Sequence, residues 1–267
     1  MNKLLLPLNI IALILTIFMN GYSQSGAFPN TVGELGESRA VFFLPAGYVF
    51  AIWGVIYLAL AGFAYYQARN ESARETVGWY FILSCAANIT WLVLFLYNQI
   101  WLSTVAMLVL LFSLVMIYTR LNRTEKPSGA RYWLLHVPFS IYLGWISVAT
   151  VANFAAALFD SGAITAFLGV PADIWAVIMM VVAGVLGLGF IFLRRNYAYA
   201  LVIVWALVGI YVRPFDTATF TAIRELNIEL VNTAALVIAI VIGVAIVAQL
   251  GRGLLGGNSL NSRANAT

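Results

Sequence analysis

Residues 132–157 read YWLLHVPFSIYLGWISVATVANFAAA, and this stretch decides the fold class. As one helix it is long enough to cross a hydrocarbon core of about 30 Å. Four of its residues follow one another at spacings of three and four, which places them on one helix face: Tyr142, Trp145, Ala149 and Asn153. An amide in hydrocarbon is costly unless it has a hydrogen-bond partner. We therefore predict that this face looks inward, onto protein or ligand.

Two earlier apolar runs carry the same kind of face. Large aromatic residues recur at helical spacing in both, and the second run also contains an amide. The residues are Phe50, Trp53 and Tyr57 in the first run, and Asn88, Trp91 and Phe95 in the second. Together the three faces predict a pocket lined by aromatic rings and amides, which suits a flat apolar ligand. Four other tryptophans lie near the starts of their runs and are expected to be interfacial anchors: Trp79, Trp101, Trp133 and Trp175.

Composition sets the class of protein. Hydrophobic residues make up 63% of the 267 and charged residues only 9%, whereas soluble domains carry roughly 25% charged residues. Eight apolar runs are long enough, or nearly so, to span a membrane, and the seventh is the weakest because it is short. The sequence therefore predicts an all-α integral membrane protein. The runs lie near residues 4–22, 46–67, 77–97, 100–120, 132–157, 173–193, 197–213 and 230–250.

Basic residues predict the topology. If eight helices alternate in direction, eleven of the fourteen basic residues lie on the side that holds both termini, and only Arg39, Arg213 and Arg224 lie on the other. The positive-inside rule then places both termini in the cytoplasm. The pI of about 9.3 is explained by the basic residues that set the membrane topology. Nucleic acid is therefore not an expected partner. The outer side has a net charge of −4, from these three basic residues and seven acidic ones.

Two features near the start of the chain each have two interpretations. Lys3, the following apolar stretch and Gly21-x-Ser23 form either a retained first helix or a signal peptide with a small-x-small cleavage site. The long connection from Ser23 to Leu44 is either a flap over an outward-opening pocket or a solvated connector.

Several classes of function lack the residues that they need. The only lysines, Lys3 and Lys126, lie outside the spans, which excludes a retinal Schiff base. No Asp or Glu lies well inside a span, so proton- or cation-coupled transport is not expected. His136 is the only histidine and Cys85 the only cysteine. A metal or hydrolytic site is therefore not predicted, and His136 is expected to be interfacial rather than a haem ligand.

The quoted residues resemble the TspO family, the tryptophan-rich sensory proteins whose eukaryotic relative is the mitochondrial translocator protein. Residues 45–57, PAGYVFAIWGVIY, are similar to the signature of the family's second helix. Asn88 and Trp91 match its third helix. Trp145 and Asn153 match the fifth-helix pair at the family's spacing of eight. The resemblance implies a five-helix transmembrane bundle over residues 1–157.

The chain also departs from the family pattern. Phe50 and Trp53 are one residue closer than usual, which implies that one ring is rotated by about 100°. Tyr48 replaces a common Trp, and Ser84 replaces a Gln one turn before Asn88, so polar contacts with a ligand are expected to differ.

Residues 158–250 add about three further transmembrane helices to the family's bundle. Their small residues predict close helix packing, and the tail at 251–267 is expected to be disordered. The small residues are Ala183, Gly184, Gly187 and Gly189.

The resemblance implies a membrane sensor or translocator that binds a porphyrin, haem or a similar flat hydrophobic molecule. Such a protein requires no cofactor, and no catalytic residue is predicted. The resemblance leaves light-dependent porphyrin breakdown open as an activity. The alternative is a scaffold or assembly protein whose aromatic and amide faces serve only packing and partner contacts. Expected partners are the lipid bilayer, a tetrapyrrole-like ligand and, as one alternative, a second copy in a homodimer. The expected location is a bacterial plasma membrane.

Overall fold

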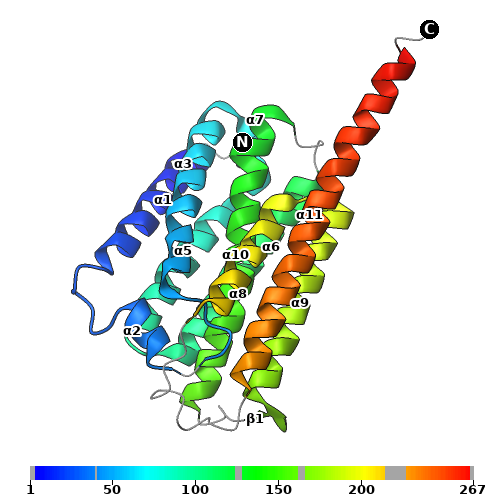
Figure 1. Ribbon diagram of the computed structural model, residues 1–267. Helices are drawn as coiled ribbons and strands as arrows, with labels where there is room; N and C mark the ends of the chain where they lie inside the picture. Colours follow the sequence, from blue (N-terminus) through cyan, green and yellow to red (C-terminus); the bar gives the residue numbers. More distant parts are fainter. Residues whose placement is uncertain (1–3, 40, 124–127, 162–165, 214–226, 265–267) are drawn as a thin grey trace.

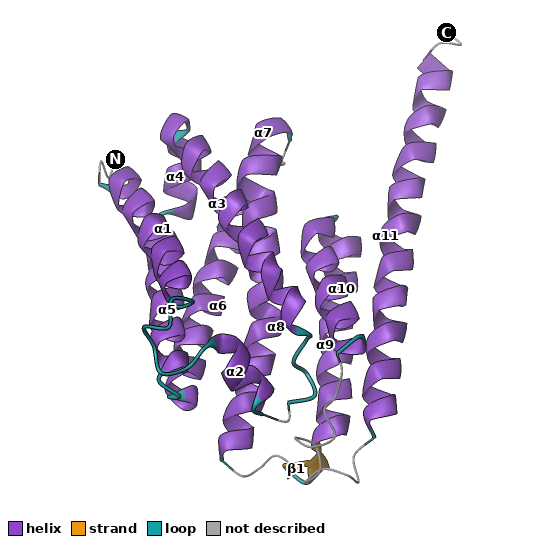
Figure 2. Cartoon of the chain, turned by 60° about the vertical axis from the view of Figure 1, so that its left-hand side comes forward, coloured by secondary structure: helices purple, strands orange, loops and turns teal. Residues whose placement is uncertain are grey.

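The computed structural model describes residues 4–39, 41–123, 128–161, 166–213 and 227–264. The described chain is almost entirely helical, and its long helices run up and down beside one another (Figure 1). Both ends of the chain lie toward the same end of the bundle (Figure 2). The helical content of the described chain confirms the predicted all-α architecture.

Five long helices form the first part of the molecule. In it α6 packs between α5 and α8, and α1 lies against α5 and α3. The long helices are α1 (Leu5–Tyr22), α3 (Ile52–Arg69), α5 (Trp79–Leu96), α6 (Ile100–Arg123) and α8 (Val137–Asp160). Short elements connect them: α2 (Val32–Glu37), the 3₁₀ helix η1 (Gly47–Ala51), α4 (Glu71–Val77), α7 (Gly129–Arg131) and the π-helical turn η2 (Tyr132–His136).

Local sequence explains the tight turns between these helices. The Asn70 side chain accepts a hydrogen bond from the Ala73 N–H and so caps the start of α4. Gly78 then takes a φ of +57°, which ends α4 and lets α5 begin at once. At the other end of α5, Asn98 takes the left-handed conformation and turns the chain into α6.

The end of the bundle away from α2 is filled by aromatic side chains. Phe63, Phe81 and Phe139 are fully buried and pack edge to face, with Phe63 4.9 Å from Phe139 and 5.1 Å from Phe81 between ring centroids. Such pairs contribute roughly 0.5–1.5 kcal/mol each beyond the area they bury. These three rings join α3, α5 and α8 at this end of the bundle.

The remaining helices form the C-terminal extension. It consists of α9 (Ala172–Arg194), α10 (Tyr197–Tyr211) and α11 (Ile228–Ala264), preceded by a two-stranded hairpin of β1 (Ala166–Phe167) and β2 (Val170–Pro171). α10 packs against α8 as well as against α9 and α11. Gly144 of α8 allows this approach, because an added Cβ would lie 3.1 Å from Val202 Cβ and 3.2 Å from the Tyr199 carbonyl oxygen.

The predicted small-residue face on the sixth run packs as expected at two of its positions. A Cβ on Gly184 would lie 2.7 Å from Ile238 of α11, and one on Gly187 would lie 3.3 Å from Ile242. α9 and α11 therefore lie close together where these glycines face α11. The division of the chain at residue 157 stays a prediction, and packing between α8 and α10 crosses it.

Seven of the described helices are long and apolar enough to cross a membrane, so the protein is a multi-pass integral membrane protein. α10 corresponds to the weak seventh run and has 15 residues, which span only about 22 Å.

The helix α11 continues to Ala264, past the point at residue 251 where the sequence predicted a disordered tail, and the disorder of that tail stays a prediction. No proline interrupts the segment, and a glycine costs a helix only about 1 kcal/mol.

Candidate functional site

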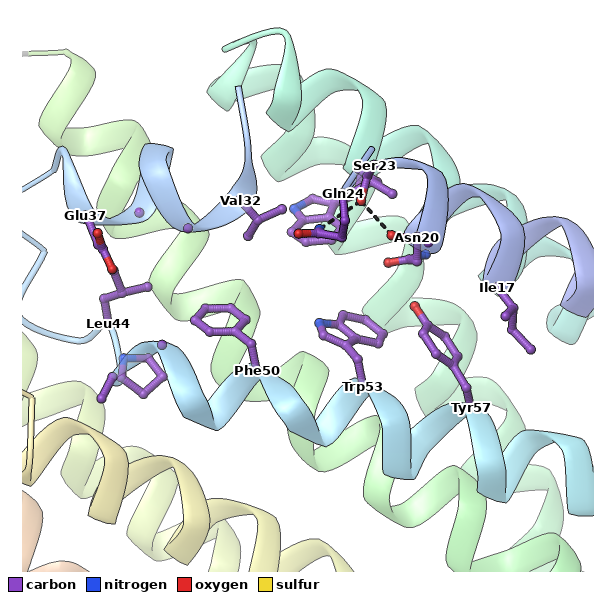
Figure 3. A pocket seen from close by; sticks show the side chains of 18 of the residues that line it. Ile17, Asn20, Ser23, Gln24, Val32, Glu37, Leu44, Phe50, Trp53 and Tyr57 are labelled. Atoms are coloured by element: carbon purple, nitrogen blue, oxygen red, sulfur yellow. Dashed lines mark hydrogen bonds between the residues drawn. The ribbon is translucent and has the colours of Figure 1, made fainter. Parts of the chain in front are cut away.

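Three aromatic side chains stand in a row at the start of α3 and face a cavity of about 970 Å³, the main cavity (Figure 3). Phe50 belongs to the 3₁₀ helix η1, whereas Trp53 and Tyr57 belong to α3. Residues three apart eclipse one another in a 3₁₀ helix. The short spacing between Phe50 and Trp53 therefore turns neither ring away from the main cavity.

Neighbouring rings extend this aromatic wall. Trp53 stacks on Tyr57, with centroids 5.6 Å apart and planes at 23°. It also lies nearly parallel to Trp91 of α5, at 6.3 Å and 26°. These rings from two helices form a continuous aromatic wall on the main cavity. Such a wall packs favourably against another aromatic system.

The opposite wall comes from α1 and from residues 23–44, which we call the cover segment. Ile17, Asn20 and Gly21 contribute from α1. Figure 3 shows Asn20, Gln24 and Val32 across the space from the α3 aromatic row. The cover segment therefore lines the main cavity, as expected of a flap.

Two sets of bonds hold the cover segment in place. Thr31 and Glu34 form a capping box at the start of α2, in which the Thr31 N–H donates to Glu34 Oε2 at 2.8 Å. These hydrogen bonds from Thr31 lower the pKa of Glu34. Beyond α2, buried Arg39 donates to both carboxylate oxygens of Asp160 in α8 at 2.8 Å, and to the Leu35 carbonyl oxygen at 2.7 Å. The cover segment is thereby fixed to the end of α8.

A smaller cavity of about 50 Å³, the inner cavity, lies on the far side of the aromatic row. Phe50, Trp53 and Trp91 line both cavities. Trp145 meets Phe50 edge to face at 5.6 Å and Trp53 at 6.3 Å. The remaining predicted site residues on its wall are Phe95, Ala149 and Asn153.

Asn153 is held entirely by protein groups. Its Oδ1 accepts from the Trp91 indole N–H at 2.9 Å, and its Nδ2 donates to the hydroxyls of Ser103 at 3.1 Å and Thr104 at 2.6 Å. The amide thus joins α5, α6 and α8. Of the two roles considered for it, ligand contact and bracing of helices, the geometry shows bracing.

Asn88 and Tyr142 lie behind the cavity walls rather than on them. Asn88 Oδ1 accepts from Asn20 Nδ2 at 2.9 Å, and Asn88 Nδ2 donates to the Tyr142 hydroxyl at 3.2 Å. This chain of hydrogen bonds ties α1 to α5 and α8. Together with the bond from Asn9 Nδ2 to Gln67 Oε1 at 2.8 Å, it favours the interpretation of the first run as a retained helix.

Two buried donors in the cavity walls have no hydrogen-bond partner among the described residues. They are the Tyr57 hydroxyl, at the main cavity, and the Trp145 indole N–H, at the inner cavity. Leaving a buried donor unpaired costs about 1–3 kcal/mol. A ligand acceptor that reached either group would recover part of that cost.

The other residues considered from the sequence lie outside both cavities. Trp79, Trp101 and Trp133 are about half or more exposed, as expected of interfacial anchors. Trp205 donates its indole N–H to the Val49 carbonyl oxygen at 3.1 Å. His136 was expected at the interface; its side chain is buried, and the π-helical turn η2 that carries it packs against α3.

The residues of the main cavity that the sequence did not single out include Asn20, Glu37 and Arg213. A signal for Asn20 was present, since Asn9, Thr16 and Asn20 recur at spacings of seven and four within an otherwise apolar run. Nothing in the local sequence marks Glu37 or Arg213, which the fold brings to the cavity from distant segments.

Comparison with known proteins identifies the family of the chain. No curated protein and no solved structure matches the chain. A family model described as TSPO-like protein matches residues 5–248, a range that includes the C-terminal extension as well as the first five long helices. The chain therefore belongs to the TSPO-like protein family.

Proposed function

We propose that this membrane protein is a sensor or translocator that binds a porphyrin, haem or a similar flat hydrophobic molecule in the main cavity. One observation carries the proposal: a wall of packed aromatic side chains faces a cavity of about 970 Å³. Sites for small molecules usually measure roughly 300–1,000 Å³ and are mostly apolar, with a few polar groups that fix orientation. The main cavity has the size and the lining of such a site.

Each part of the wall has a role in the proposal. Trp53 and Tyr57 stack on the face of the ligand, and Phe50 and Trp91 extend that surface. Trp145 supports Phe50 and Trp53 from behind. Asn88 and Asn153 act indirectly, because their hydrogen bonds hold α1, α5, α6 and α8 in register around the space.

A second function, that of a membrane scaffold, is supported by the same two amides. Asn88 and Asn153 both form their hydrogen bonds with other protein side chains. Under this alternative the aromatic faces serve only packing, and a homodimer or another membrane protein is the partner. Light-dependent porphyrin breakdown is a further activity that the family resemblance allows.

The proposed orientation follows from charge. With eleven of fourteen basic residues on the side of the termini, both termini lie in the cytoplasm of a bacterial plasma membrane and the main cavity faces outward. A reporter fused to the C-terminus measures this orientation directly, and a periplasmic signal from the intact chain would contradict it.

Titration with protoporphyrin tests the proposed binding. Trp53 and Trp91 line the main cavity, so a bound porphyrin quenches their fluorescence. We expect saturable quenching in the purified protein, beyond the inner-filter loss measured with free tryptophan at matched absorbance. Loss no greater than that of free tryptophan would favour the scaffold.

A further inference from the structure

The C-terminal extension reaches the main cavity through the stretch that begins α3. The Ala46 N–H donates to the Gly209 carbonyl oxygen of α10 at 3.0 Å. Just beyond α10, Arg213 Nη1 donates to the carbonyl oxygens of Val41 at 2.7 Å and Leu44 at 3.2 Å. The extension therefore holds the segment that leads into Phe50.

Arg213 also gives the main cavity its charge. Among the described residues that line this cavity, Arg213 is the one basic side chain and Glu37 the one acidic side chain. Arg39 is committed elsewhere, in its buried pair with Asp160. The cation at the main cavity therefore comes not from Arg39 of the cover segment but from Arg213, which lies 172 residues from its partner Val41 in the sequence.

Two features of its surroundings shift the pKa of Arg213 in opposite directions. Burial lowers the pKa of Arg213, and the Glu37 carboxylate raises it in part. An arginine side chain stays protonated in proteins. The guanidinium is therefore a fixed, partly desolvated cation, and such groups bind carboxylates by charge-assisted hydrogen bonds.

We propose that Arg213 is a specificity-determining residue of the ligand site and selects flat apolar molecules that carry a carboxylate at one edge. This rests on the proposed function of the main cavity. The ring lies on Trp53 and Tyr57, and its carboxylate points toward Arg213 at the end lined by Glu37 and Leu44. Glu37 repels the same carboxylate, so it limits the affinity that Arg213 provides.

The position of Arg213 answers the charge objection raised by the sequence. The outer side as a whole has a net charge of −4, which is poor for attracting an acid from solution. A single buried cation inside the cavity acts at short range instead, where screening by water and salt is weaker. Selection for the acid therefore occurs after the ring has entered the cavity.

The test compares protoporphyrin IX with its dimethyl ester, which keeps the ring and removes both negative charges. Full-length protein in nanodiscs of neutral phosphatidylcholine is titrated with each, and binding is read from tryptophan quenching. In the wild type we expect the acid to bind roughly tenfold more tightly than the ester. In Arg213→Gln we expect this ratio to fall to about 1 with little change for the ester.

Two further variants separate charge from position. Arg213→Lys keeps the cation but loses the guanidinium fork, so it should retain part of the preference for the acid. Glu37→Gln removes the competing carboxylate, so it should strengthen acid binding several-fold and leave ester binding unchanged. If Arg213→Gln fails to fold, the acid-to-ester ratio of the wild type and its partial retention in Arg213→Lys still test the assignment.

Three results would overturn the assignment. An acid-to-ester ratio of about 1 in the wild type, or an unchanged ratio in folded Arg213→Gln, removes the role in specificity. Equal weakening of acid and ester in Arg213→Gln would reduce Arg213 to a structural brace for residues 41–44. Saturable binding of neither porphyrin by the wild type would refute the proposed function itself, and the assignment with it.

Discussion

Gly209→Ala tests whether α10 is docked against the start of α3. A Cβ added at Gly209 would overlap Val49 Cγ2 and lie 3.0 Å from Pro45 Cβ. Val49 is fully buried, so it has little room to yield. Overpacking of this kind costs about 1–3 kcal/mol, which exceeds the gain of up to about 1 kcal/mol from replacing a helical glycine by alanine.

The size of the effect is measured by thermal unfolding in detergent. We expect the midpoint to fall by roughly 2–4 °C for each kcal/mol lost in a chain of this size. Gly243→Ala in α11 is the matched control, because a Cβ there has no neighbour within 4 Å. It should leave the midpoint unchanged or raise it slightly.

A double-variant cycle identifies the contact responsible. Val49→Ala alone removes two buried methyl groups, worth about 0.8 kcal/mol each before any cavity cost. It also removes the atom that clashes with the new Cβ. We therefore expect the double variant to be more stable than the sum of the single effects predicts, by about 1–2 kcal/mol. Additive effects, or a neutral Gly209→Ala, would refute the docking of α10 on this segment.

Further predictions concern the aromatic walls, the amide network and the cover segment. Trp145→Phe should weaken porphyrin binding by about 1–2 kcal/mol. The Trp133 side chain is 67% exposed, so Trp133→Phe should leave binding unchanged. Equal effects of the two substitutions in the porphyrin titration would contradict this prediction. Asn153→Ala leaves the buried Trp91 N–H unpaired, so unfolding should become easier by about 1–3 kcal/mol. The capping box lowers the pKa of Glu34, so the stability that it adds to the cover segment is fully present above pH 4.5, the ordinary pKa of a glutamate. This stability is lost as the pH falls through the lowered pKa. Below that pH the cover segment should become more sensitive to protease in the wild type but not in Glu34→Gln.

The sequence predicted the helices and the inward faces because both depend on local spacing. Apolar length set the spans, and amides at helical spacing had to face protein. It did not predict the neighbours of those faces. Asn20 and Asn88 are 68 residues apart, and Arg213 and Val41 are 172 apart. Periodicity assigns a residue to a helix face but does not say which distant segment packs on it. For the same reason, the sequence predicted that the amides face inward but could not decide between ligand contact and bracing of helices.

Filling the main cavity with a bulky side chain tests most directly the central claim that a porphyrin binds there. Gly21 lines the cavity from α1, and a Cβ there meets no atom within 4 Å. Gly54 of α3 offers equal space but lies outside both cavities. We predict that Gly21→Phe abolishes saturable quenching by protoporphyrin while Gly54→Phe binds as the wild type does. Unchanged affinity in folded Gly21→Phe would contradict binding in the main cavity.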